Sequence, residues 1–283
     1  MHIAVDIGNT TIAFAVVDKN KILAVKRIDT NVKSESFKLQ LIGVLRGFKR
    51  RYGRIDRAIV CSVVPRVLGI IKNGVKTELG AKVSVVGEDI KVAMVNRYKN
   101  PRQVGQDRLV GAYAAMMLYG KPAIIIDLGT AITFDAVSIK GEYLGGAIVP
   151  GIRLSAESLF LKTALLPEID IKAPKSVIGR TTQESILSGL FYGYGSLCRG
   201  FIDLIEQQIK GRPVIIMTGG HTQLMKRFIK GLPSSLRNAK ASEFIDRSNQ
   251  RFDIKKGAAK GSGHRLIDEH LVFKGLSLLL LKQ

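Results

Sequence analysis

Two short stretches of the chain each place an aspartate at the end of an apolar run and a glycine two residues later. The first is Asp6-Ile7-Gly8-Asn9-Thr10, and the second is Asp127-Leu128-Gly129-Thr130. An aspartate supplies hard oxygens for a divalent cation. Glycine amides can approach phosphate oxygens closely, and threonine hydroxyls can donate hydrogen bonds to them. The combination suits a metal-bound polyphosphate, although Asp-x-Gly is also ordinary turn chemistry.

Each stretch lies between two apolar runs that are rich in β-branched residues, which predicts a strand, a tight glycine turn and a second strand. The flanking runs cover residues 3–5 and 12–17 in the first copy, and 124–126 and 132–137 in the second. Two such hairpins in matching contexts favour a duplicated domain, with a nucleotide bound between the two halves.

The pattern after the first hairpin predicts the remainder of a ribonuclease-H-like half. Residues 21–28 are expected to form a third strand. A helix with apolar residues between positions 37 and 48 follows, and then a buried strand over residues 58–64. A second helix should begin after Pro65 and end at Gly80, before a strand over residues 82–86. The predicted order is three strands, helix, strand, helix, strand.

Asp107 lies in the first turn of a helix predicted to carry Leu109, Ala112, Met116 and Met117 on its apolar side. A carboxylate at this position complements the helix dipole. It could instead act as a base that accepts a proton from a substrate hydroxyl. Spacing alone favours the structural role.

The second half is predicted to open at Ala123, with strands through Asp127, Phe134 and Tyr143. A long helix should begin at Thr181-Thr182-Gln183-Glu184-Ser185, which carries N-cap and first-turn signals, and should run to about Lys210. A strand over residues 214–217 leads into Thr218-Gly219-Gly220-His221. Its amides could meet an adenine or a phosphate, or the glycines could simply form a tight turn.

Composition indicates a soluble cytoplasmic protein. The 283 residues are 46% hydrophobic, which is ample for one large domain or two ordinary ones. Cys61 and Cys198 are expected to be buried free thiols, because two cysteines make no disulfide framework. No signal segment is apparent, and the apolar run over residues 276–281 is far too short to span a bilayer. A membrane partner is therefore not expected, and the scattered histidines predict no His-based metal site.

The formal net charge of +21 predicts attraction to polyanions in general. The basic residues are not interleaved with aromatics, there is no tryptophan, and no nucleic-acid-binding motif is visible. Specific nucleic-acid binding is therefore not expected. Residues 239–266 are polar and basic, and their composition predicts a flexible loop or insertion.

Several motifs, taken in order, resemble those of the type III pantothenate kinases, in the superfamily of the acetate and sugar kinases, Hsp70 and actin. They cover nearly the whole chain: Asp6-Ile-Gly-Asn-Thr10, Ser62-Val-Val-Pro65, Tyr98-Lys-Asn-Pro101, Gly105-Gln-Asp-Arg108, Asp127-Leu-Gly-Thr-Ala131, Gly145-Gly-Ala-Ile-Val-Pro-Gly151, Thr163-Ala-Leu-Leu-Pro167, Thr218-Gly-Gly220 and Leu271-Val-Phe-Lys-Gly-Leu276. The resemblance implies two α/β, ribonuclease-H-like domains and a homodimer. The segment 239–266 departs from it, being longer and more basic than the family usually carries.

The resemblance also implies an activity: transfer of the ATP γ-phosphoryl group to the primary hydroxyl of pantothenate, the first step of coenzyme A synthesis. It reverses the preference stated for Asp107, which becomes the proton acceptor. Asp6 would lie near Mg²⁺, directly or through water, and Asp127 would help bind K⁺ or NH₄⁺. ATP would contact Asp6, Ile7, Gly8, Asn9, Thr10, Thr11, Ile12, Ala13 and Thr130, and pantothenate would contact Tyr98, Gly105, Gln106, Asp107, Arg108 and Thr182.

Three points stay open from the sequence. Arg108 could keep Asp107 ionised, or it could pair with the carboxylate of pantothenate. The division into residues 1–118 and 119–283, with a basic insertion at 239–266, is an expectation. A nucleotide-binding regulator on the same fold and an ATPase without a small-molecule acceptor are the competing functions. Retention of Asp6, Asp107 and Asp127 together argues against the regulator.

Overall fold

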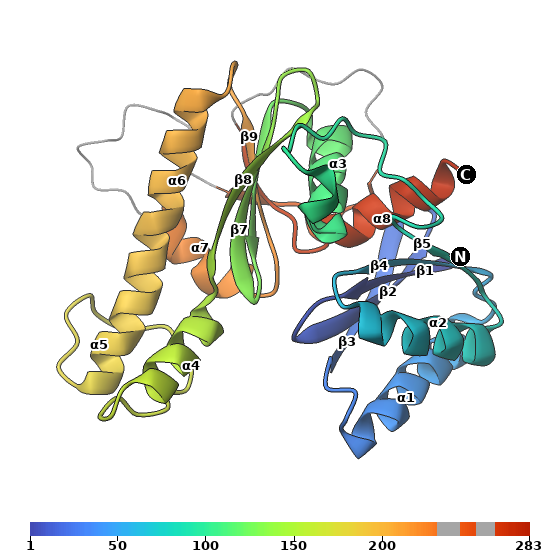
Figure 1. Ribbon diagram of the computed structural model, residues 1–283, viewed down its shortest axis with the longest axis horizontal. Coiled ribbons are helices and arrows are strands. Elements are labelled where there is room, and N and C mark those ends of the chain that lie inside the picture. Colours follow the sequence, from blue (N-terminus) through green and yellow to red (C-terminus); the bar gives the residue numbers. More distant parts are fainter. Residues whose placement is uncertain (231–243, 253–263) are drawn as a thin grey trace. The chain divides into compact units, whose positions relative to one another are not determined.

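The computed structural model describes residues 1–230, 244–252 and 264–283, which form two compact α/β units (Figure 1). The first unit comprises Met1–Tyr119 and His270–Gln283, together with residues 249–252. The second comprises residues 120–230, 244–248 and 264–269. Within these described residues, no helix is both long enough and apolar enough to cross a membrane.

A five-stranded sheet forms the centre of the first unit, with the strand order β3-β2-β1-β4-β5. The strands are β1 (His2–Ile7), β2 (Thr11–Asp18), β3 (Lys21–Asp29), β4 (Arg57–Ser62) and β5 (Lys82–Val85). The first three pair antiparallel, whereas β4 and β5 extend the sheet in parallel from β1. This is the order of a ribonuclease-H-like half, as the sequence predicts.

Side chains alternate between the two faces of this sheet. Ile3, Val5 and Ile7 belong to one buried cluster with the apolar faces of α1 (Glu35–Tyr52) and α2 (Pro65–Leu79). On the opposite face, the His2 imidazole lies 2.9 Å from the Ser277 hydroxyl of α8 (Leu271–Leu281). The helix α3 (Gln106–Tyr119) packs on α8 and also contacts β4. Asp6 lies four residues after His2 on the same strand, so both side chains are on the same face of the sheet. The Asp6 side chain therefore lies on the face that α3 and α8 cover.

A six-stranded sheet forms the centre of the second unit, with the order β10-β11-β9-β6-β7-β8. Its strands are β6 (Ala123–Leu128), β7 (Ala131–Val137), β8 (Tyr143–Pro150), β9 (Val214–Thr218), β10 (Phe244–Asp246) and β11 (Arg265–Ile267). The first three again form an antiparallel meander, and β9, β11 and β10 continue in parallel. The helices are α4 (Ile152–Lys162), α5 (Thr182–Ser188), α6 (Tyr194–Gln208) and α7 (Thr222–Lys230).

Three sequence expectations differ from this structure. The C-terminal helix α8 belongs to the first unit, although the division at residues 118/119 assigned it to the second half. The segment 239–266 is not wholly a loop, because β10 lies within it and β11 begins at its end, at Arg265; residues 239–243 and 253–263 are outside the described part. The helix expected over 181–210 contains a π-helical turn at Gly189–Gly193, which separates α5 from α6.

Candidate functional site

The turn between β1 and β2 presents polar groups at the end of a buried strand, as the sequence predicts. The Gly8 N–H donates to the Thr11 carbonyl at 3.0 Å, which closes the turn. Thr30, which follows β3, secures it from the side, because its hydroxyl donates to the Gly8 carbonyl at 2.8 Å. Asn9 and Thr10 remain exposed. The turn is therefore a fixed loop with exposed amide and hydroxyl groups, which suits an anion.

The carboxylates of Asp6 and Asp107 both affect the pKa of one buried thiol, that of Cys61. Asp6 on β1 pairs in register with Cys61 on the parallel strand β4. The pKa of the Cys61 thiol is raised well above its usual value, first by burial and then by the negative charges of Asp6 and Asp107. Since each carboxylate is close enough to influence this thiol, the fold of the first unit gathers both aspartates on one side of the sheet.

The Asp107 carboxyl group is held at the first turn of α3. Its Oδ1 accepts a hydrogen bond of 2.8 Å from the backbone N–H of Arg108. Burial raises the pKa of Asp107, and the Arg108 amide and guanidinium oppose that shift. A carboxylate with a raised pKa is a stronger base than an exposed aspartate. The position therefore combines a restrained geometry with the basicity needed to accept a proton.

Residues 105 and 106 have packing roles that spacing could not predict. A Cβ atom on Gly105 would collide with the Asp107 carboxylate, so only glycine leaves room for that side chain. The Gln106 side chain packs over Gly87, which has a φ of 91°. Tyr98 is half-buried in the preceding loop, and its N–H donates to the Asn96 side chain at 3.0 Å.

The turn between β6 and β7 repeats the first turn in a shorter form. Ile7 pairs with Ile12 across the first turn, whereas Leu128 pairs with Ile132 across the second, so the second turn is one residue shorter. The Gly129 N–H donates to the Ala131 carbonyl at 3.1 Å. Asp127 is half-buried at the end of β6, and Thr130 is exposed. Both hairpins thus confirm the sequence prediction.

Two further glycines bring backbone against the second turn. The Gly151 N–H, at the start of α4, donates to the Thr130 carbonyl at 2.9 Å. Gly219 follows β9 with a φ of 93°, and a Cβ atom there would collide with the Asp127 carboxylate. The N-terminus of α4 therefore lies beside the turn, and a helix N-terminus favours anions.

Arg153 and His221 complete the surroundings of the second turn, and the sequence motifs did not single out either side chain. The His221 N–H donates to the Leu128 carbonyl at 3.0 Å. Burial lowers the pKa of His221, and the positive charge of Arg153 lowers it further. The only sequence signal was the glycine pair that precedes His221.

Thr182 is exposed at the start of α5. The hydroxyl of Thr181 accepts the Glu184 N–H at 3.2 Å, and the Glu184 carboxylate accepts the Arg180 N–H at 2.8 Å. This confirms the predicted helix start. Among the hydrogen bonds that the structure describes at this helix start, none joins Thr182 to Asp127 or Thr130.

A metal ion at these turns would have few protein ligands. No group of three or more His, Cys, Asp or Glu side chains that could hold a metal occurs within residues 1–230, 244–252 and 264–283. Mg²⁺ does not require such a cage, because it usually keeps several waters and binds one or two carboxylates plus substrate phosphates. A half-buried Asp6 beside an exposed turn fits that requirement.

Comparison with known proteins gives one family and one fold. A family model for the type III pantothenate kinases matches residues 2–204. The type III pantothenate kinase of Persephonella marina is 41% identical over 231 residues, which cover 80% of this chain and 90% of the relative. That of Finegoldia magna is 40% identical over 230 residues, with 80% and 88% covered.

Solved structures share the fold at low identity. The ethanolamine utilization protein EutJ from Carboxydothermus hydrogenoformans aligns with a TM-score of 0.51 and 13% identity, over 98% of this chain and 89% of that one. A ROK family glucokinase from Streptomyces griseus, in complex with glucose and AMPPNP, also gives 0.51 and 13%, over 99% of each chain. These likenesses support the α/β fold with two ribonuclease-H-like sheets.

Proposed function

We propose a reaction for this chain from one premise: the chain belongs to the type III pantothenate kinase family. It is an ATP-dependent kinase that phosphorylates pantothenate, the entry reaction of coenzyme A synthesis. ATP is the co-substrate, with a divalent metal on its phosphates. The proposals below concern which residues of this chain perform the reaction.

Asp107 is the proton acceptor in this proposal. The observation that carries it is a half-buried carboxylate with a raised pKa, fixed by the Arg108 amide at the first turn of α3. The pantothenate hydroxyl oxygen attacks the γ-phosphorus, the bond from that phosphorus to ADP breaks, and the hydroxyl proton passes to a carboxylate oxygen of Asp107. Phosphoryl transfer needs positioning and charge neutralisation more than covalent help from the protein.

Each glycine turn carries groups that suit a polyphosphate. In the first turn the exposed Asn9 and Thr10 contact ATP, together with backbone groups of residues 7–13 other than the Gly8 N–H, which is donated to Thr11; Ile12 and Ala13 are buried, so only their backbone takes part. In the second turn Thr130 donates to a phosphate oxygen, assisted by the N-terminus of α4 and by Arg153. A bound Mg²⁺ near Asp6 neutralises charge on the phosphates.

Asp127 holds a monovalent cation, K⁺ or NH₄⁺, in this scheme. Its half-buried carboxylate sits against Gly219, whose lack of a side chain leaves space beside the oxygens. Carbonyl oxygens of the turn are available as further hard ligands.

Tyr98 and residues 105–108 of the first unit position pantothenate in this proposal, and the role of Thr182, in the second unit, stays a prediction from the sequence. We assign Arg108 to Asp107 and not to the pantothenate carboxylate, because its amide and its positive charge both lower the pKa of Asp107. These interactions oppose the larger effect of burial, which raises that pKa.

A homodimer accords with the surface of the second unit. Large apolar side chains are exposed on α4 and on the segment between α4 and α5, which is unusual for a surface that only water covers. Leu165, for example, is 90% exposed, and its neighbours of the same kind are Leu154, Phe160, Leu161, Val177 and Ile178. We assign this surface to the contact between two copies.

The direct test is ADP release from ATP and Mg²⁺, measured with and without pantothenate, each in potassium or sodium salts. Pantothenate-dependent release that requires potassium agrees with the reaction and with a monovalent site. Release that is indifferent to pantothenate would indicate an ATPase, and ATP binding without any release would indicate a regulator.

A further inference from the structure

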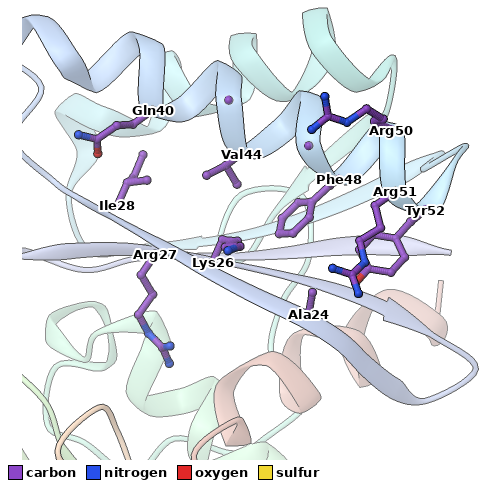
Figure 2. A pocket seen from close by; sticks show the side chains of 12 residues that line it. Ala24, Lys26, Arg27, Ile28, Gln40, Val44, Phe48, Arg50, Arg51 and Tyr52 are labelled. Carbon is purple, nitrogen blue, oxygen red and sulfur yellow. The ribbon is translucent and has the colours of Figure 1, made fainter.

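A groove in the first unit lies outside every residue assigned above to ATP or pantothenate. It has a volume of about 680 Å³ and runs between the strand β3 and the helix α1 (Figure 2). Figure 2 shows Val44 and Phe48 pointing from the helix toward the strand, so the groove has an apolar floor.

The rim of this groove is strongly basic. Lys26 comes from β3, whereas Arg50 and Arg51 come from α1, and the lining contains no acidic residue. The Arg27 side chain points away from α1 and is not part of this basic rim (Figure 2). None of the side chains of Lys26, Arg50 and Arg51 belongs to an ion pair within the described part of the chain. Three cations without neutralising partners attract a polyanion.

One side of the groove is the open edge of a sheet. Within the residues that the structure describes, β3 is the outermost strand and pairs only with β2. The Leu23 carbonyl of β3 already accepts a hydrogen bond of 3.4 Å from the Tyr52 hydroxyl, so pairing with a partner would use the other outward groups of the strand. An edge strand offers unpaired N–H and C=O groups to another extended chain.

Two glycines leave the helix side of the groove without side chains at their positions. Gly43 and Gly47 lie one turn apart in α1, and a Cβ atom on either would meet no atom within 4 Å. Glycine inside a helix is less stable than alanine by roughly 0.5–1 kcal/mol. No described neighbour requires these glycines, and their effect is to leave the α1 backbone accessible from the groove.

We propose that this groove binds an extended acidic segment of a partner protein. The segment pairs its backbone with β3 and directs the carboxylates of its α1-facing side to Lys26, Arg50 and Arg51, while alternate side chains lie on the other face of the sheet. A single-stranded nucleic acid fits less well, because bases stack on exposed aromatic faces. Phe48 is only 4% exposed, and the Arg51 guanidinium lies 5.5 Å from the centre of the Tyr52 ring.

The test uses a fluorescent octapeptide of alternating glutamate and valine, titrated with the full chain at about 0.15 M salt and followed by anisotropy. Gly47→Leu fills the groove with a better helix former, and we expect it to weaken binding at least about tenfold. Gly69→Leu is the matched control, because Gly69 also lies in a helix with open space around it. Arg51→Gln should weaken binding, whereas Lys38→Gln, on α1 but outside the groove, should not.

Circular dichroism and pantothenate phosphorylation should be unchanged in all four variants, so a loss of binding would not reflect unfolding or a failed kinase site.

Two further probes can overturn the proposal. An octapeptide of equal charge with prolines in place of two valines cannot pair with β3, and equal binding would exclude strand pairing. An oligothymidylate that binds more tightly, with the same sensitivity to Gly47→Leu, would make the partner a nucleic acid.

Discussion

The backbone N–H of Arg108 donates a 2.8 Å hydrogen bond to the carboxylate of the residue before it, Asp107. This bond fixes one oxygen of the half-buried carboxylate, and in the proposed reaction the other oxygen meets the substrate hydroxyl. Burial and this local donor have opposite effects on the pKa of the same group. The predictions that follow start from that balance.

Asp107→Asn should lower the rate of phosphoryl transfer by about 10²–10⁴-fold, because the amide cannot accept the proton. ATP affinity, measured by calorimetry, should change little. Asp29→Asn, an exposed aspartate on β3, is the control and should keep full activity. A comparable loss of nucleotide affinity in Asp107→Asn would contradict the assignment as a base.

Asp107→Asn should also make the protein more stable at neutral pH. The folded-state pKa of Asp107 is raised, so its protonated form is favoured by folding. The stability that this group contributes is present below the unfolded pKa and is lost as the pH rises through the folded pKa. The variant should therefore melt at a higher temperature than the parent at pH 7, and the difference should shrink toward pH 4. A lower melting temperature at pH 7 would argue that the carboxylate is stabilised where it lies.

Arg108→Gln should move the acidic limb of the kcat/KM profile to higher pH. The guanidinium lowers the pKa of Asp107, so without it the base protonates at a higher pH and activity is lost earlier on acidification. If the limb does not move and the KM for pantothenate rises instead, Arg108 pairs with the substrate carboxylate.

Asp127→Asn should weaken potassium activation while leaving the fold intact. Loss of one negative ligand raises the potassium concentration needed for half-maximal activity by about tenfold or more. A potassium titration at saturating ATP and pantothenate measures this. An unchanged titration curve would remove Asp127 from the cation site.

Gly219→Ala should destabilise the protein by more than about 1 kcal/mol, because alanine is strained at positive φ and its Cβ would collide with Asp127. Gly200→Ala is the control, since Gly200 lies within α6 with open space around it and alanine is the better helix former. Urea unfolding of both variants compares the two effects. Equal stability of the two variants would show that the turn adjusts freely.

The local elements could be predicted because their signals are local. An Asp-x-Gly turn between two β-branched runs predicts both hairpins, and Pro65 and Gly80 mark the ends of α2. The environment of Asp107 could not be predicted, because its burial depends on helix packing and not on the spacing of residues 105–108. For the same reason the sequence could not predict that Arg153 and His221 lie around the second turn, because the two residues are far apart in sequence.

The two main errors of architecture also concern distant contacts. The assignment of α8 to the second half followed chain order, whereas its partners are distant in sequence: the Arg57 guanidinium donates to the Leu280 carbonyl at 2.7 Å. The strands β10 and β11 have three residues each, too few for a periodic pattern, and they are defined by pairing: β10 pairs with β11, and β11 pairs with β9. The π-helical turn between Gly189 and Gly193 likewise could not be predicted from the 3.6-residue spacing of apolar residues.

The membership of α8 in the first unit also sets an order of events during synthesis. The ribosome makes residues 1–119 first, but the helix that packs on α3 and β1 comes only after every residue of the second unit. The face of the sheet that bears Asp6 therefore stays without one of its two covering helices while the second unit emerges and folds. The half of the enzyme that is translated first is the half that is completed last.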